Sequence, residues 1–137
     1  MRGKAVSRVH SHDELKWALQ ALALPAGAQL NLFPDFASVT DELALDFDHW
    51  RATALGQHQL DPAQVAALAS IDALLAEMTG AENVALWTDA ALAQHPSWRQ
   101  LREKARGALH AFGWDLATPP MDRAVFVRGS VGDDTPD

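Results

Sequence analysis

One segment, residues 61–80 (DPAQVAALASIDALLAEMTG), restricts the fold more than any other part of the chain. Asp61 is a favoured N-cap residue, Pro62 suits the first helical position, and Gly80 ends the run. Apolar side chains occupy nearly every side of the expected helix: Val65, Leu68, Ile71, Leu74, Leu75 and Met78. Because a helix that is apolar nearly all round is normally buried, this segment predicts a central helix in a bundle.

Two helices are predicted before this segment, each with one apolar face. The first opens at Ser11, where Glu14 completes a capping box, and it stops near Pro25. Its core residues recur at i, i+3, i+4 and i+7: Leu15, Ala18, Leu19 and Leu22. The second begins at Ser38 or Thr40 and ends at Gly56. Its core residues are Leu43, Phe47, Trp50 and Ala54.

Two more helices are predicted after it. A short one starts at Thr88 and Asp89 and is interrupted by Pro96. The last ends at Gly113 and places one apolar stripe on the core: Trp98, Leu101, Ala105, Ala108 and Phe112.

Three short segments are predicted as strands: residues 4–9 (KAVSRV), 28–33 (AQLNLF) and 123–128 (RAVFVR). The expected fold class is therefore α+β and predominantly helical, with a central helical bundle and a small sheet formed by N-terminal and C-terminal strands. Residues 1–128 are expected to form a single globular domain, and residues 129–137 a disordered acidic tail.

Composition narrows the class of protein. The chain has 137 residues, no cysteine and a formal charge of −7, so disulfides and thiolate metal sites are excluded. A negative field repels phosphate backbones and attracts a basic partner, although acidity can also serve solubility alone. No apolar run suits a membrane span or a signal peptide. We therefore expect a cytoplasmic protein that binds neither nucleic acid nor membranes.

The outer face of the helix over residues 41–55 is unusually acidic. Four carboxylates and one leucine share the side away from the core: Asp41, Glu42, Leu45, Asp46 and Asp48. A partner could insert an apolar side chain beside Leu45 while its Lys and Arg meet the acids, which predicts a binding surface. Alternatively, acids in the first turns only favour the helix dipole, and one exposed leucine is ordinary.

The first helix carries a second apolar line, Trp17, Ala21 and Leu24, nearly opposite its first. Either the helix is covered on both sides, or one side is a docking surface. On the second interpretation Trp17 is the candidate aromatic anchor for a partner.

A metal site and an active site are only weakly indicated. Glu42, Asp46 and His49 could face one way, but no other helix supplies the matching Glu-x-x-His of a di-metal bundle. His10 and His12 form an equally incomplete set, so no cofactor is expected. Recognised catalytic signatures are absent, which disfavours an enzyme without excluding a site assembled from distant residues.

Buried and clustered charges need partners. Asp72 falls on the most apolar helix, so we expect an ion pair with Arg51 or with an arginine of the last helix; a catalytic acid is the alternative. The last helix concentrates basic residues that are expected to lie near the acidic helix or in solvent: Arg99, Arg102, Lys104 and Arg106.

The opening SHDELKWALQALALPAG, preceded by KAVSRV, resembles the start of barstar-type inhibitors, which run strand, helix and then a Leu-Pro turn. The resemblance covers roughly residues 4–27. The next run, AQLNLFPDFASVTDEL, lacks the tyrosine-glycine and Asn-Leu-Asp-Ala-Leu pattern of that family, so neither its inhibitory residues nor its fold is carried over. In type, a small acidic helical protein without cysteine is also similar to bacterial immunity proteins that neutralise basic nuclease toxins.

These observations favour an acidic protein-binding inhibitor, such as an immunity protein that neutralises a basic toxin. Two alternatives stay open. One is a small metal-dependent helical enzyme that uses Glu42, Asp46 and His49. The other is a regulator or scaffold that forms a homodimer through its apolar helix faces.

Overall fold

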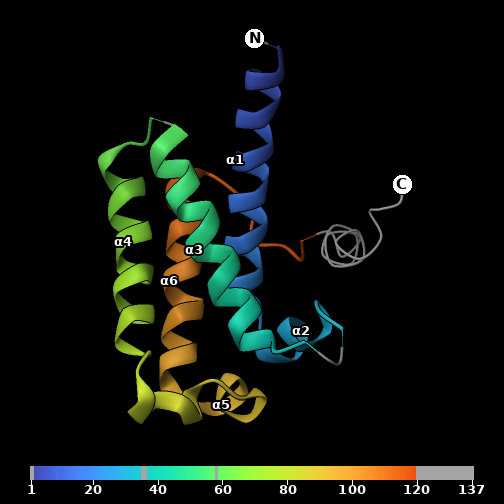
Figure 1. The fold of residues 1–137 in the computed structure, drawn as a ribbon, viewed down its shortest axis with the longest axis vertical. Helices are drawn as coiled ribbons and strands as arrows, with labels where there is room; N and C mark the ends of the chain where they lie inside the picture. The colour runs from blue at the N-terminus through green and yellow to red at the C-terminus, as the bar shows by residue number, and fades with distance from the viewer. Residues whose placement is uncertain (1, 35–36, 58, 120–137) are drawn as a thin grey trace.

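The computed structural model of the protein describes residues 2–34, 37–57 and 59–119. Its helices follow one another in the order α1 (Arg2–Ala23), α2 (Ala26–Asn31), α3 (Val39–Gln57), α4 (Pro62–Glu77), the 3₁₀ helix η1 (Ala81–Leu86), α5 (Asp89–Gln94) and α6 (Pro96–Phe112). Within these ranges the chain contains no strand (Figure 1).

The prediction of an α+β fold is therefore wrong. Residues 4–9 belong to α1, and residues 28–31 of the second expected strand belong to α2. Residues 123–128, the third expected strand, and the expected tail at 129–137 lie outside the described residues. A strand needs a paired neighbour, whereas a helix that is already formed gains one hydrogen bond for each residue added to it. Helix α1 consequently continues past Ser11 toward the N-terminus instead of starting at the expected capping box.

Four long helices make the bundle. Helix α1 packs against both α3 and α6, and α4 packs against the other side of α6. Helices α3 and α4 contact each other only lightly, although they lie on the same side of the molecule (Figure 1). This uneven packing leaves space between α3 and α4.

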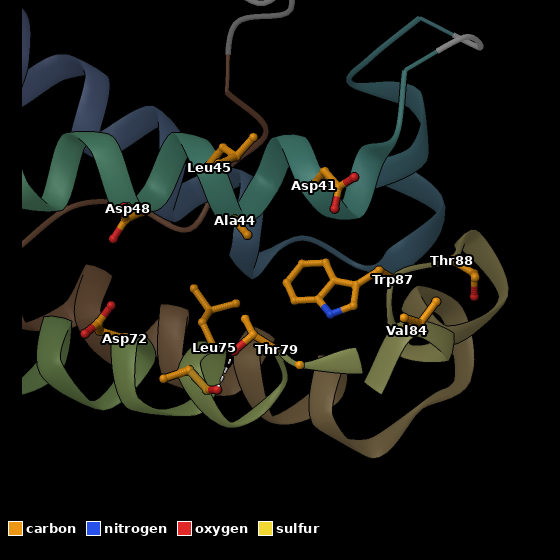
Figure 2. A pocket seen from close by; sticks show the side chains of 12 residues that line it. Asp41, Ala44, Leu45, Asp48, Asp72, Leu75, Thr79, Val84, Trp87 and Thr88 are labelled. Atoms are coloured by element: carbon orange, nitrogen blue, oxygen red, sulfur yellow. Dashed lines mark hydrogen bonds between the residues drawn. The ribbon is translucent and has the colours of Figure 1, made fainter. Parts of the chain in front are cut away.

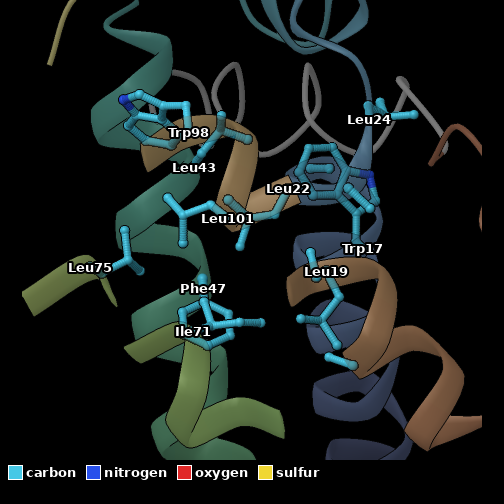
Figure 3. Close-up of a cluster of buried hydrophobic side chains, with 14 of the residues drawn as sticks. Trp17, Leu19, Leu22, Leu24, Leu43, Phe47, Ile71, Leu75, Trp98 and Leu101 are labelled. Atoms are coloured by element: carbon cyan, nitrogen blue, oxygen red, sulfur yellow. The ribbon is translucent and has the colours of Figure 1, made fainter. Parts of the chain in front are cut away.

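The core is built from the apolar stripes that the sequence predicts. Leu19 and Leu22 of α1, Phe47 of α3, Ile71 of α4 and Leu101 of α6 are all fully buried (Figure 3). Trp98 is fully buried as well, and its indole nitrogen Nε1 donates to the carbonyl oxygen of Leu86, 2.8 Å away. The helical spacing thus correctly predicts the core faces of α1, α3 and α6, whereas Val65, counted in the apolar surface of α4, is 41% exposed.

Helix α4 begins as predicted but lies at the edge of the bundle, not at its centre. The Asp61 carboxylate accepts from the Gln64 backbone N–H at 2.8 Å, and the Gln64 side chain accepts from the Asp61 N–H at 3.0 Å. The outer side of the helix is exposed and consists mainly of small residues: Ala63, Ala66, Ala69 and Ala73. Since alanine has little apolar area, leaving it in water costs little, and the prediction of a central helix fails for that reason.

The connection after α4 closes the lower end of the bundle in Figure 1. Gly80 adopts a φ of 112°, a left-handed conformation that L side chains rarely take. The Trp87 indole Nε1 donates to the carbonyl oxygen of Met78 at 2.8 Å, and its ring meets that of Trp98 edge to face with centroids 5.5 Å apart. These contacts hold η1 and Trp87 against the end of α4.

None of the described helices is both long enough and apolar enough to cross a membrane.

Candidate functional site

A groove of about 670 Å³ lies between α3, α4 and η1 (Figure 2). Helix α3 contributes four residues to its wall: Asp41, Ala44, Leu45 and Asp48. Helix α4 contributes three more, Asp72, Leu75 and Ala76, and Thr79 follows just beyond the end of that helix. The turn and η1 close one end with Gly80, Val84, Trp87 and Thr88.

The groove follows from the light packing between α3 and α4. Helix α3 packs mainly on α1 and helix α4 mainly on α6, and the two helices contact each other only lightly. Short side chains line part of the groove: Ala44 on α3, Ala76 on α4, and Thr79 just beyond the end of α4.

The groove is mainly apolar, and part of that surface is in water. Leu45 is 66% exposed and Val84 67% exposed, the largest exposures among the large apolar residues described. The Trp87 ring lies between them at the end of the groove, with its polar N–H already bonded to Met78 (Figure 2). An exposed apolar surface that gathers in one hollow is typical of a binding site.

Carboxylates line the rim on both walls. Asp41 and Asp48 lie on α3 and Asp72 lies on α4, and the described residues of the wall include no Lys, Arg or His. Arg51, just beyond the groove, places Nη2 3.1 Å from Asp48 Oδ1 and Nε 3.6 Å from Asp72 Oδ1. Arg51 thus contacts two of the three carboxylates with one positive charge, so the described rim keeps a net negative charge.

The contact with Arg51 confirms the ion pair that the sequence predicts for Asp72. It also ties α3 to α4 across the groove. The Asp72 side chain is 46% exposed, so this carboxylate is not the buried acid that its helix suggests. Exposure reduces both the desolvation cost and the strength of the pair.

The structure brings together some of the residues predicted to bind a partner and separates others. Asp41, Leu45 and Asp48 line the groove, whereas Glu42 and Asp46 are half-buried and do not line it. Trp17 is only 3% exposed and packs edge to face against Phe33, with ring centroids 6.1 Å apart. The structure therefore places Trp17 in the core and does not bring it to this surface.

The residues of the alternative metal-site hypothesis do not assemble into a ligand group among the described side chains. Among the described side chains, no group of three or more His, Asp or Glu could hold a metal ion, and Glu42, Asp46 and His49 form no such group. The His49 ring instead meets the Trp50 ring edge to face, 4.4 Å away. The side chains of His10 and His12 are outside the described ones.

Two basic residues of α6, Arg102 and Lys104, bind within the bundle and not to the acidic face of α3. Arg102 Nη1 donates to Gln29 Oε1 at 3.2 Å and to the Leu92 carbonyl at 3.0 Å. Burial lowers the pKa of Arg102, and the nearby charges of Arg99 and Arg106 lower it further. Lys104 Nζ donates to Ser70 Oγ at 2.7 Å, which joins α6 to α4.

A second cavity, of about 440 Å³, separates α1 from the segment after α6. Its wall mixes acidic and basic side chains, including Asp13 and Lys16, and Gln20 Nε2 crosses it to donate to the Asp115 carbonyl at 2.9 Å. This cavity therefore lies between two parts of the fold, α1 and the segment after α6, that already hydrogen-bond to each other, and its wall carries both signs of charge. The groove between α3 and α4 is therefore the candidate site.

The residues that the sequence predicts for a binding surface and that line the groove all lie on the α3 wall. Leu75 and Val84 gave no local signal of function, because nothing in the sequence shows that they lie opposite Leu45. The spacing of Asp72, Leu75, Ala76 and Thr79 at i, i+3, i+4 and i+7 was the available clue to a second helical face.

No model of a known protein family matches this chain, and neither does any curated protein or solved structure. Residues 4–9 are helical, so the strand on which the barstar resemblance partly depends is not present.

Proposed function

We propose that this protein is an inhibitor that binds a basic protein in the groove between α3 and α4, in the manner of an immunity protein that neutralises a basic toxin such as a nuclease. The observation that carries the proposal is the groove itself. It combines the exposed apolar side chains of Leu45 and Val84 with a rim of three aspartates.

The apolar part of the groove supplies affinity. Burying a leucine-sized side chain stabilises a complex by about 1.5–3 kcal/mol, and such contacts at the centre of an interface dominate its binding energy. Leu45 and Val84 stand more than half exposed in the free protein, so much of their surface is still available for burial by a partner.

The acidic rim selects the partner and speeds its approach. Asp41, Asp48 and Asp72 repel acidic surfaces and attract Lys and Arg, and the formal charge of −7 extends the same field over the whole molecule. A nuclease must carry Lys or Arg where it holds the phosphates of its substrate. Covering that basic surface would block the substrate, which is the inhibitory mechanism proposed. The cytoplasm is the proposed place of action.

The test compares two leucines on one helix. Leu45 lines the groove, whereas Leu55 lies outside it on the same helix and is 43% exposed, so Leu55→Glu is the matched control for Leu45→Glu. Full-length wild type and both variants are immobilised and exposed to proteins from the source cells. The expected partner is a basic protein that is retained by wild type and Leu55→Glu and lost from Leu45→Glu.

The captured protein is then purified and its activity measured, nucleic-acid cleavage first. Wild type should abolish that activity at a stoichiometric ratio, and Leu45→Glu should need at least about ten times more protein. Equal capture by all three forms, or capture without inhibition, would refute the proposal.

A further inference from the structure

The geometry points to the kind of element that fills the groove: a basic amphipathic helix of the partner, laid between α3 and α4. This inference rests on the proposed function, and it adds which part of the partner is recognised and how.

The two walls share a helical spacing. Residues 41, 44, 45 and 48 of α3 follow i, i+3, i+4 and i+7, and residues 72, 75 and 76 of α4 follow i, i+3 and i+4. This is the stripe that one helix presents to another in helix packing. The wall on α3 spans about 10.5 Å, or two turns, and the wall on α4 spans about one turn before the helix ends at Glu77 and Thr79 continues the wall. The groove is thus lined by a helix on each of two sides, and the space between these helices could accommodate a third.

Hydrogen bonding favours a helix over an extended segment. An extended peptide is recognised through backbone bonds to an open sheet edge. The walls here are helices, in which the backbone groups beside the groove are already bonded within α3 and α4. An extended peptide would leave its own N–H and C=O groups unpaired above Ala44 and Leu75, which costs free energy. A helix satisfies its backbone internally and presents only side chains.

The positions of the charges set the pattern of the helix. Asp41 and Asp48 are two turns apart on one wall, and Asp72 lies on the opposite wall. An apolar stripe on the bound helix would meet the groove between them, with Lys or Arg on both flanks. Trp87 and Val84 close one end, so the stripe would end against their apolar surfaces (Figure 2).

A second copy of the chain fits the groove poorly. Its own acidic rim would face an acidic rim, and each copy carries a formal charge of −7. The most basic helix, α6, has its apolar stripe in the core, where Trp98, Leu101 and Ala105 are fully buried. That helix could enter another groove only by unfolding its own bundle.

The test is a selection of peptides against the full-length protein. A displayed library of peptides of about 15 residues, four helical turns, is selected on wild type at low salt. Enriched sequences should carry apolar residues at i, i+3 or i+4, and i+7, flanked by Lys or Arg. Fluorescence anisotropy should show affinity that falls at least about tenfold with Leu45→Glu and stays unchanged with Leu55→Glu.

Proline substitution then tests the conformation of the bound peptide. Proline in the middle of a helix costs about 3 kcal/mol, equivalent to more than a hundredfold in affinity, whereas proline at the first position is tolerated. Peptides that bind through Leu45 but tolerate central proline would overturn the helical occupant. A selection that returns no peptide dependent on Leu45 would overturn it as well.

Two other occupants are outcomes of the same experiments. Leu45-dependent binding of a synthetic peptide of residues 121–130 would assign the groove to this chain's own sequence, and a Leu45-dependent dimer in sedimentation would assign it to a second copy. Either result refutes the inference. These results can be told apart from a failure of the proposed function. If a captured toxin needs Leu45 for binding but docks through a loop, the proposed inhibitor function stands and only the inference of a bound helix is refuted.

Discussion

Gln29 offers the sharpest test of how the helices of the bundle are held together. Its side chain is completely buried, which is rare for glutamine. The amide Nε2 donates to the carbonyl oxygens of Ala21 and Leu22, both at 3.0 Å, and Oε1 accepts from Arg102. One side chain therefore joins the end of α1 to α2 and to α6, and Arg102 continues the connection to α5 through the Leu92 carbonyl.

Replacing Gln29 by leucine keeps the approximate size and removes all three bonds. Two neutral hydrogen bonds contribute about 1 kcal/mol each, and the bond from the charged guanidinium about 2 kcal/mol. Burial of the more apolar leucine side chain raises the free energy of unfolding by about 1 kcal/mol. We therefore expect Gln29→Leu to lower the free energy of unfolding by about 3 kcal/mol.

Urea denaturation followed by circular dichroism measures this change. With an m-value of about 2 kcal/mol/M, the midpoint should fall by about 1.5 M while m stays constant. Gln100→Leu on the exposed face of α6 is the control, with an expected change within about 0.5 kcal/mol. A loss below about 1 kcal/mol for Gln29→Leu would refute the reasoning, because it would mean that water replaces these bonds at little cost.

Three further predictions concern the groove and its walls. Gly80→Ala should destabilise the protein by about 1–2 kcal/mol in thermal unfolding, because φ is 112° and a Cβ would lie 3.1 Å from the Glu82 carboxylate; stability equal to wild type would contradict the left-handed turn. Asp61→Ala should cost about 1 kcal/mol in urea denaturation through loss of the capping box, and no change would mean that the cap is replaced by solvent. Asp41→Asn should slow association with the selected basic peptides several-fold in stopped-flow experiments at low salt, and about 0.3 M salt should erase most of that difference. Glu77→Gln, outside the groove on α4, is its control, and an equal effect of both substitutions would show that total charge rather than the rim controls the rate.

Under the proposed function, helix α3 serves both stability and recognition. On α3, Leu43 and Phe47 are buried in the core, while Leu45, two residues from each of them, is exposed and lines the groove. A helix turns about 100° per residue, so these positions point in different directions. Substitutions at Leu45 should consequently alter binding with little effect on folding, and substitutions at Phe47 should do the reverse.

Local patterns in the sequence were sufficient to predict most of the helical content and one wall of the site. The N-cap at Asp61, the apolar stripe of the helix that ends at Gly113 and the acids around Leu45 all depend on residues a few positions apart, where helical geometry alone relates them. The prediction of strands at residues 4–9 and 28–33 was wrong because a short apolar pattern fits a strand or a helix equally well. Only a neighbouring strand could have decided between the two structures.

The groove itself was decided by tertiary structure. Its walls at Leu45 and Leu75 are 30 positions apart in the sequence, and their separation follows from the packing of α3 on α1 and of α4 on α6. The same packing buries Trp17 and leaves α4 at the edge of the bundle. A sequence determines which faces of its helices are apolar, but which of those faces remain uncovered depends on how all the helices share a limited buried volume.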